Sequence, residues 1–336
     1  MSTRLPIIYG AGLFGARGTN ANINDLAQAQ RLLDVCIQYG VQGIDTSRIY
    51  GIGTSEEVVT FSRSAISIRS SFNVHCGSTS QNLILKELGI FPRKPGDHAP
   101  ERLKELVHES IKALNGIKIR VLYLHAPDRS VPYEDTVKAL DELHKEGLFE
   151  HFGLSNYLSF EVAEIATICR LKGYVMPTVY QGVYNYLDRT AEPEFAFRAP
   201  SNFSLASASM ASALLLIALS RWNKDGSHWD TKTGGISHYY SFRYGHAIPA
   251  LREIKALADQ LGLTLNEVAA RWLMHHSRML ESDWGIIYGG SKTDQLEATL
   301  IDSSKGPLPM EIVAALDEAW LRVMHKVPLY TQITPS

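Results

Sequence analysis

The fold of this chain is decided by residues 43–51, which read GIDTSRIYG. The apolar run at 41–44 leads directly into an acid, Asp45, and a tyrosine, Tyr50, follows five residues later. An apolar run that ends in polar residues is typical of a buried strand of a parallel sheet, which delivers side chains to a site at its carboxyl end. We therefore expect Asp45 and Tyr50 to lie at such a site, with partners on other strands.

Apolar runs of strand length alternate with segments of helical periodicity along the rest of the chain. The predicted strands lie near Ile7 and at 41–46, 119–124, 149–154, 174–180 and 284–288. The predicted helices lie at 25–39, 101–114, 134–146, 160–172, 249–261, after a capping box at Thr264 and Glu267, and from Thr293 onward. Such alternation demands a parallel sheet. With a third strand expected within 72–90 and a seventh near 203–209, the count of eight predicts an α/β fold, the closed (β/α)8 TIM barrel, as a single domain over residues 1–336.

Two regions of this barrel are expected to be irregular. Residues 59–97 should contain the third strand, but much of the segment is rich in serine and arginine and has no clean period. It is an atypical insertion or a divergent segment. The region of the seventh strand, 194–213, is interrupted at Pro200 and has no glycine turn after the strand.

Bulk composition excludes several classes of function. The 336 residues carry a formal net charge of −2, which removes an electrostatic case for nucleic-acid binding. Three cysteines, far apart, argue against a disulfide framework and for a reducing compartment. The apolar run at 210–219 is too short for a bilayer, which needs ~20 residues, and we expect no secretory leader at the N-terminus. We expect a cytoplasmic protein without a membrane partner, and a homodimer is left open.

A glycine-rich motif near the N-terminus matches a dinucleotide fingerprint only formally. Residues 10–15 read GAGLFG, with the glycine spacing of that fingerprint. The fingerprint needs a helix that begins at its last glycine, so that the helix N-terminus faces the pyrophosphate. Residues 16–24 are polar and typical of a loop. The sequence therefore disfavours a Rossmann domain.

Polar side chains follow most of the predicted strands, and a barrel would bring them to one mouth. They are Asp45 and Tyr50 after the second strand, His125 after the fourth, Ser155 and Asn156 after the fifth, Gln181 after the sixth, and Ser291, Lys292 and Gln295 after the eighth. Each alone has an ordinary structural explanation, such as a turn-forming aspartate or a packing tyrosine. Their shared position at strand ends is what favours a functional site.

This set of residues suits the protonation of a carbonyl oxygen. A tyrosine can donate that proton if its pKa, ~10 when free, falls toward neutrality. A nearby ammonium group lowers the pKa, an aspartate can hold the ammonium, and a histidine can orient the carbonyl. Serine, asparagine and glutamine suit a carboxamide. Ser291 and Lys292, at the start of a helix, suit a phosphate.

Four motifs together resemble the aldo-keto reductase superfamily, most closely its aflatoxin-aldehyde reductase branch and fungal relatives. They are residues 43–51, 122–128 (LYLHAPD), 153–157 (GLSNY) and 177–185 (PTVYQGVYN), and the resemblance runs from about residue 5 to 330.

The resemblance implies a (β/α)8 barrel that reduces a small-molecule carbonyl substrate with NADPH. By residue, it implies Tyr50 as general acid, His125 as the carbonyl-orienting residue and Asp45 as the partner of a catalytic lysine. The same resemblance assigns cofactor contacts to Ser155, Asn156 and Gln181 (carboxamide), Ser207 (the loop after the seventh strand), and Ser291, Lys292 and Gln295 (2′-phosphate and adenine). No metal ligand is implied. Tyr239, Tyr240 and Tyr244 are the aromatic candidates for contacts to the substrate.

The catalytic lysine departs from the family's pattern. The family has it at the end of the third strand, where a gapless comparison places Leu88. Lys86 lies two residues earlier and, by strand alternation, on the same face. Lys86 is therefore either the catalytic cation or a solvated lysine, and Lys94 is a further candidate.

Other functions remain as alternatives. An NADPH-binding regulator with impaired catalysis is favoured by the displaced lysine. A metal-dependent barrel hydrolase lacks the His-x-His that would supply ligands from the first strand. A short-chain dehydrogenase would need a helical Tyr-x-x-x-Lys, which is matched only by Tyr288 and Lys292 around a predicted Gly-Gly turn.

Overall fold

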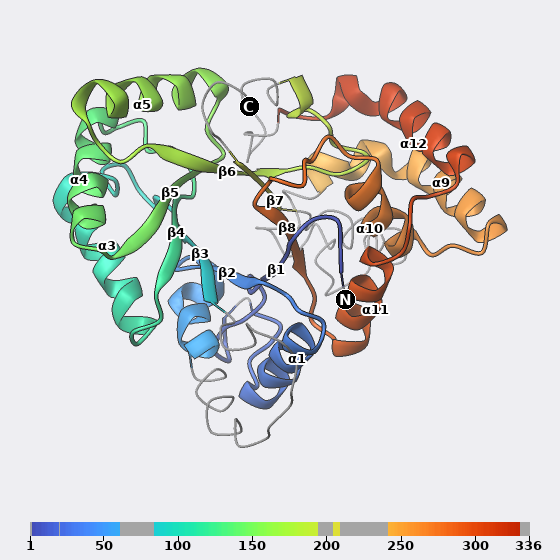
Figure 1. Cartoon of the computed structure of the whole chain (residues 1–336), viewed down its shortest axis with the longest axis horizontal. Helices are drawn as coiled ribbons and strands as arrows, with labels where there is room; N and C mark the ends of the chain where they lie inside the picture. The colour runs from blue at the N-terminus through green and yellow to red at the C-terminus, as the bar shows by residue number, and fades with distance from the viewer. Residues whose placement is uncertain (1, 20, 61–83, 194–203, 209–240, 330–336) are drawn as a thin grey trace.

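The computed structural model describes residues 2–19, 21–60, 84–193, 204–208 and 241–329, with only the backbone described at 84–88 and 204–208. Several predictions lie outside these residues: most of the 59–97 segment, the loop after residue 208, and the aromatic candidates Tyr239 and Tyr240. Figure 1 shows the course of the described chain.

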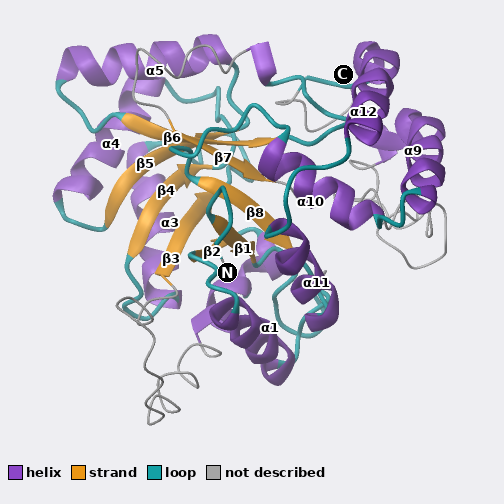
Figure 2. Ribbon diagram, turned by 45° about the vertical axis from the view of Figure 1, so that its right-hand side comes forward, coloured by secondary structure: helices purple, strands orange, loops and turns teal. Residues whose placement is uncertain are grey.

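Eight parallel strands form the centre of the molecule (Figures 1 and 2). They are β1 Ile7–Gly10, β2 Gly43–Ser47, β3 Ile84–Ile90, β4 Ile119–Leu124, β5 Phe149–Ser155, β6 Pro177–Val183, β7 Ser204–Ala208 and β8 Gly285–Gly289. Each strand pairs with the next, and β1 pairs with β8, so the described strands close into a barrel. The alternation in the sequence thus predicted the α/β architecture and the strand order.

Helices surround these strands, and most of them lie directly beside the barrel (Figure 2). They are α1 Leu26–Gln38, α3 Pro100–Ala113, α4 Tyr133–Lys145, α5 Ser159–Lys172, α9 Ile248–Gln260, α10 Leu265–His275, α11 Thr293–Ser303 and α12 Met310–Val323. The last of these was not predicted. Their inner faces bury apolar side chains in the core, including Leu33 of α1, Leu140 of α4 and Trp272 of α10. Among the described residues, none of the helices combines the length and the apolar character that a membrane span requires.

The bounds of one strand differ from the prediction because a backbone N–H bonds to a side chain and not to a neighbouring strand. The sixth strand was predicted from residue 174, but β6 begins at Pro177. The backbone N–H of Val175 donates to Asp141 Oδ1 at 2.9 Å, so it is used outside the sheet. At α10, the Thr264 hydroxyl accepts from the Glu267 N–H at 3.0 Å as predicted. The Glu267 carboxylate instead pairs with Arg271 and Lys305.

The third strand contains an irregularity at the position where the lysine question arises. Ile44 of β2 pairs with Leu85, whereas its neighbour Asp45 pairs with Glu87, so Lys86 is an extra residue in β3. A β-bulge of this kind interrupts the strict alternation of faces along a strand. Alternation alone therefore does not decide whether Lys86 and Leu88 share a face, and their side chains lie outside the described part. In contrast, β7 pairs in continuous register with β6 and β8.

Candidate active site

The carboxyl ends of β2 and β6 meet inside the barrel through Asp45 and Gln181. Asp45 is 7% exposed and pairs in register with Gly10 of β1. Gln181 Nε2 donates to Asp45 Oδ1 at 3.2 Å. Because β2 and β6 are not adjacent strands, this hydrogen bond crosses the barrel interior. Two of the predicted site residues are thus brought together from positions 136 residues apart in the chain.

Tyr50 begins a tight left-handed turn directly after β2. Gly51, Ile52 and Gly53 have φ angles of 56°, 54° and 90°. Gly51 cannot carry a side chain, since a Cβ there would lie 2.6 Å from the carbonyl oxygen of Phe14 and 2.7 Å from Gly15 Cα. The close approach of Gly15 and Gly51 locks the loop after β1 against the tyrosine turn.

The glycines at 10–15 therefore allow close packing of the backbone and do not belong to a dinucleotide-binding fold. No helix begins at Gly15, and the next helix, α1, begins at Leu26. A Cβ at Gly12 would lie 3.7 Å from Tyr50 Cζ, so the backbone at Gly12 runs along the phenol ring. The motif at residues 10–15 therefore does not mark a Rossmann domain, and the polar loop after it had indicated this.

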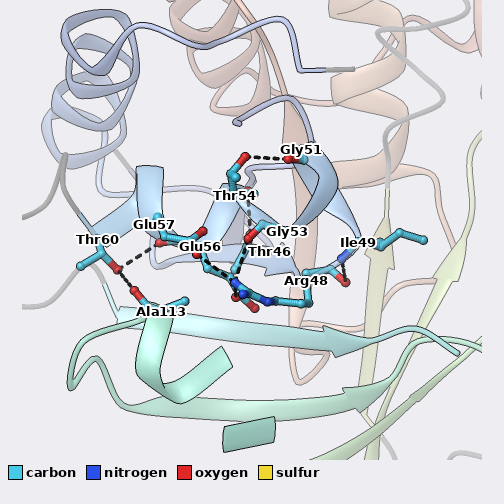
Figure 3. A network of polar contacts seen from close by, with 12 residues as sticks. Thr46, Arg48, Ile49, Gly51, Gly53, Thr54, Glu56, Glu57, Thr60 and Ala113 are labelled. Carbon is cyan, nitrogen blue, oxygen red and sulfur yellow. Dashed lines mark hydrogen bonds and ion pairs between the residues drawn. The ribbon is translucent and has the colours of Figure 1, made fainter. Parts of the chain in front are cut away.

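Arg48 holds the tyrosine turn in place through a network of polar contacts (Figure 3). Its Nη1 donates to the Gly53 carbonyl oxygen at 2.7 Å, to Glu56 Oε2 at 2.8 Å and to Glu57 Oε1 at 3.0 Å. Glu56 is fully buried, and burial raises the pKa of its carboxyl group although Arg48 opposes the shift. The turn that carries Tyr50 thus depends on a buried acid and a half-buried guanidinium.

His125 lies beside Tyr50 at the exit of β4. The two ring centroids are 5.9 Å apart with the rings at 78°, and the Phe91 ring meets the His125 ring in a T-shaped contact, with centroids 5.5 Å apart and the rings at 84°. His125 Nδ1 lies 3.2 Å from Ser47 Oγ. Burial lowers the pKa of His125 to about 4, so the ring is neutral near pH 7.

A glycine of β3 makes room for the His125 ring. A Cβ at Gly89 would lie 2.5 Å from His125 Nδ1. No side chain fits at this β3 position while His125 keeps its place. Sequence reasoning missed Ser47, Gly89 and Phe91 as neighbours of His125. Ser47 was within the opening motif, and Gly89 follows the position expected for the lysine.

Asn156 joins the exits of β4 and β5. Its backbone is left-handed, with φ of 62°. Its Nδ2 donates to the His125 carbonyl oxygen at 2.7 Å and to Ser155 Oγ at 3.0 Å. Ser155 pairs in register with Gln181. Ser155, Asn156 and Gln181 therefore form one continuous polar edge with His125 and Asp45.

The three predicted phosphate and adenine residues form a second group at the start of α11. Lys292 is the N-cap residue of α11, and both Lys292 and Gln295 are exposed. The carbonyl oxygen of Ser291 accepts from Gln28 Nε2 at 2.9 Å, and that of Gly290 accepts from the Tyr9 hydroxyl at 2.7 Å. These bonds hold the segment after β8 in position, with a cation at a helix N-terminus. Ser207 lies in β7, and its side chain is outside the described part.

Other sequence candidates are placed differently. Lys94 is exposed, and its backbone N–H donates to Asp97 Oδ2 at 3.1 Å in a turn. Tyr244 is buried, and its hydroxyl accepts from Asn185 Nδ2 at 3.3 Å. It is therefore not open to a substrate, contrary to the prediction. Tyr288 is in strand β8 and not in a helix, which contradicts the dehydrogenase alternative. The described residues contain no group of three or more potential metal ligands.

Comparison with known proteins agrees with this arrangement. The model of the aldo/keto reductase family matches residues 6–321. An aldo-keto reductase of Pseudocercospora fijiensis is 32% identical, with 86% of this chain and 96% of that protein aligned. Aldo-keto reductase pigE of Monascus ruber is 31% identical, with 98% and 97% aligned. Aflatoxin B1 aldehyde reductase member 4 of Homo sapiens is 32% identical, with 88% and 89% aligned. The barrel, the strand-end residues and these matches show that the chain belongs to the aldo/keto reductase family.

Proposed function

We propose that this protein reduces an aldehyde or ketone to an alcohol, with NADPH as cofactor and Tyr50 as the proton donor. The observation that carries the proposal is the pairing of Tyr50 with His125, 5.9 Å between ring centroids, at the end of the barrel that also holds Asp45 and Gln181. The nicotinamide cofactor supplies hydride when it is bound. Tyr50 supplies a proton to the oxygen atom, and His125 orients that atom when its Nε2 carries a proton.

The donor set at the polar edge suits a carboxamide. Both hydrogens of Asn156 Nδ2 are used, by the His125 carbonyl oxygen and by Ser155 Oγ. The remaining amide oxygen of Asn156 is an acceptor, which matches the NH₂ group of a nicotinamide. Asn156, Ser155 and Gln181 would thus hold the carboxamide, with Ser207 on the neighbouring strand as a further contact.

The start of α11 suits the phosphate of NADPH better than the ribose of NADH. Lys292 is a cation at the N-cap, where the helix dipole also favours negative charge. The 2′-phosphate of NADPH is a dianion, so Lys292 and Ser291 would hold it, with Gln295 on the first turn of the helix beside the adenine.

A lowered pKa of Tyr50 requires a cation, and we propose Lys86 for this role. Lys86 is the bulge residue of β3, between the positions paired with Ile44 and Asp45. A bulge re-aims a side chain relative to a regular strand and is common beside active sites. Asp45 would hold the ammonium group.

An NADPH-binding regulator with little catalysis is the second candidate. It is favoured by Leu88, which stands in β3 where a gapless comparison places the catalytic lysine. In this case the cofactor residues would bind NADPH, but Tyr50 would keep a pKa near that of a free phenol.

The test is to follow oxidation of NADPH by the purified protein with a panel of aldehydes and diketones, and to measure NADPH binding separately by fluorescence. Tyr50→Phe should lower kcat by about 10²-fold or more, the contribution of a general acid, and leave NADPH affinity unchanged. Tyr39→Phe is the matched control, because Tyr39 is at the end of α1 and pairs with Glu297.

The outcomes separate the candidates. Turnover that survives Tyr50→Phe contradicts the mechanism, and NADPH binding without turnover in the wild type supports the regulator. Lys86→Met should abolish turnover if Lys86 is the cation, whereas Lys94→Met should keep the turnover of the wild type. Equal rates in the wild type and Lys86→Met would remove Lys86 from the site.

A further inference from the structure

A buried hydroxyl on β2, that of Ser47, contacts the ring of His125. We infer that Ser47 is a positioning residue that holds His125 as the tautomer protonated on Nδ1, so that the neutral ring presents an unprotonated Nε2 to a ligand. The tautomer follows from contacts in the structure. Its consequence for turnover rests on the proposed carbonyl reduction.

The hydrogen-bond capacity of Ser47 decides the tautomer. A hydroxyl group has one hydrogen to donate and two lone pairs to accept with. Ser47 is fully buried, and its Oγ donates to the carbonyl oxygen of Gly89 at 2.5 Å. That carbonyl oxygen has no hydrogen, so the direction of this bond is fixed. Ser47 Oγ also accepts from the Ile49 N–H at 3.5 Å.

The remaining contact of Ser47 is the one to His125. Its single hydrogen is already used, so at the 3.2 Å contact Ser47 Oγ must accept and His125 Nδ1 must donate. The tautomer of a histidine is set in this way by the bond that one ring nitrogen makes. Because Gly89 has no side chain, the ring can approach the strands closely enough to make this bond.

Among the described residues, no charged side chain is seen in contact with the His125 ring that would change this tautomer. From η1, the 3-10 turn Tyr50–Gly53, the titratable phenol of Tyr50 faces the ring, and Phe91 faces it from the segment after β3. Ser47 and Gly89 face it from β2 and β3. Among the described groups, burial is the cause that lowers the pKa of His125.

An unprotonated Nε2 can bind the alcohol of the proposed reaction but not the carbonyl compound. A carbonyl oxygen only accepts hydrogen bonds, whereas an alcohol also donates. The neutral ring therefore pairs through Nε2 with a hydroxyl group, that of the product alcohol or of Tyr50. The ring donates to a carbonyl oxygen from Nε2 only when both nitrogens are protonated. Carbonyl orientation by His125 should then strengthen as the pH falls, and alcohol binding should strengthen as it rises.

The first measurement is independent of activity. Two-bond ¹H–¹⁵N correlation spectra of the ¹⁵N-labelled protein without ligand report which ring nitrogens carry protons, and the His125 signals among the 12 histidines are those lost in His125→Gln. At neutral pH the wild type should show a protonated Nδ1 and an unprotonated Nε2. In Ser47→Ala the two nitrogens should move toward averaged values. A protonated Nε2 in the wild type would overturn the inference, and this outcome needs no variant of Ser47.

Thr46→Val is the matched control for Ser47→Ala. Thr46 is also fully buried on β2, and its hydroxyl contacts Ser55 Oγ at 2.9 Å instead of the histidine. The control loses a neighbouring buried hydroxyl and should keep the wild-type nitrogen pattern. An Nδ1 signal that is the same in Ser47→Ala as in the wild type would also overturn the inference.

The second measurement connects the tautomer to turnover. Between about pH 5 and pH 8, kcat/KM for aldehyde reduction by the wild type should rise as the pH falls. In Ser47→Ala, where a neutral ring can carry a proton on Nε2, the ratio of acidic to neutral kcat/KM should fall toward one. Thr46→Val should keep the wild-type ratio. A loss by the same factor at every pH would mean that Ser47 is merely structural and would overturn its positioning role.

Failure of this inference and failure of the proposed function give different results. If the protein reduces no carbonyl compound, the nitrogen spectra still decide the tautomer. If it reduces carbonyl compounds but Nε2 is protonated in the resting protein, the function stands and the role of Ser47 is wrong.

Discussion

At the scale of single residues, the site depends on positions where a side chain is missing as much as on those where one is present. Gly51 and Gly15 approach so closely that neither has space for a Cβ, and this contact sets the place of Tyr50. Gly89 likewise leaves the space that the His125 ring occupies. A motif shows which polar residues are present, but the space they need is provided by residues far away in the chain.

Gly89→Ala should therefore displace His125. The new Cβ would be 2.5 Å from Nδ1, so the ring or β3 must shift, and overpacking of this kind costs about 1–3 kcal/mol. We expect a lower midpoint in urea unfolding and a fall in kcat, with NADPH affinity retained. Gly306→Ala is the control, since a Cβ there meets no atom within 4 Å. An unchanged kcat in a folded Gly89→Ala protein would show that the position of His125 is not critical.

At the scale of elements, the turn after β2 is held by charge as well as by packing. Arg48, which precedes the turn, bonds to the Gly53 carbonyl oxygen at the end of the turn and to the acids at the start of the following helical residues (Figure 3). Ile52, a β-branched residue with φ of 54°, is strained in this turn, and such strain persists only where the surroundings enforce it. The Arg48 network is the enforcing contact.

Arg48→Met should loosen the turn and leave the buried carboxylate of Glu56 without its cation. Removal of one partner of a buried pair is strongly destabilising, and for this half-buried arginine we expect about 2 kcal/mol. Urea unfolding measures the loss. Lys255→Met is the comparison, because Lys255 pairs with exposed Asp259 and its loss should cost less than about 1 kcal/mol. Similar losses in both variants would contradict a special role of the Arg48 network.

At the scale of the whole molecule, one buried ion pair ties the loop after β6 to the C-terminal part of the chain. Arg243 and Asp188 are both fully buried, with Arg243 Nε 2.6 Å from Asp188 Oδ2. Arg243 also donates to the carbonyl oxygens of Leu329 and Pro328 at 3.2 and 3.4 Å. Three segments that are far apart in sequence thus meet at one guanidinium group.

Arg243→Met should unfold at lower denaturant than the wild type, because Asp188 is left as a buried and unpaired charge. The expected loss is about 3–5 kcal/mol of unfolding free energy. Arg322→Met, which removes an exposed pair with Glu253, should change the stability by at most about 1 kcal/mol. The idea fails if Arg243→Met is as stable as Arg322→Met.

The sequence alone specified the family, the order of strands and helices, and most of the polar residues at the mouth. It could do so because strand and helix periodicities are local, and because the motifs around Asp45, His125, Asn156 and Gln181 are short and continuous. The sequence did not reveal the bulge at Lys86, since a bulge depends on the pairing of two strands and not on one strand's composition.

Only the tertiary structure decided how these residues act on one another. The bond between Gln181 and Asp45 crosses the barrel, and the contact of Ser47 with His125 joins residues 78 positions apart. The glycines at 12, 15 and 51 took their meaning from the tyrosine turn that packs on them. Distances across a closed barrel are set by packing and strand register, so no local pattern could have supplied them.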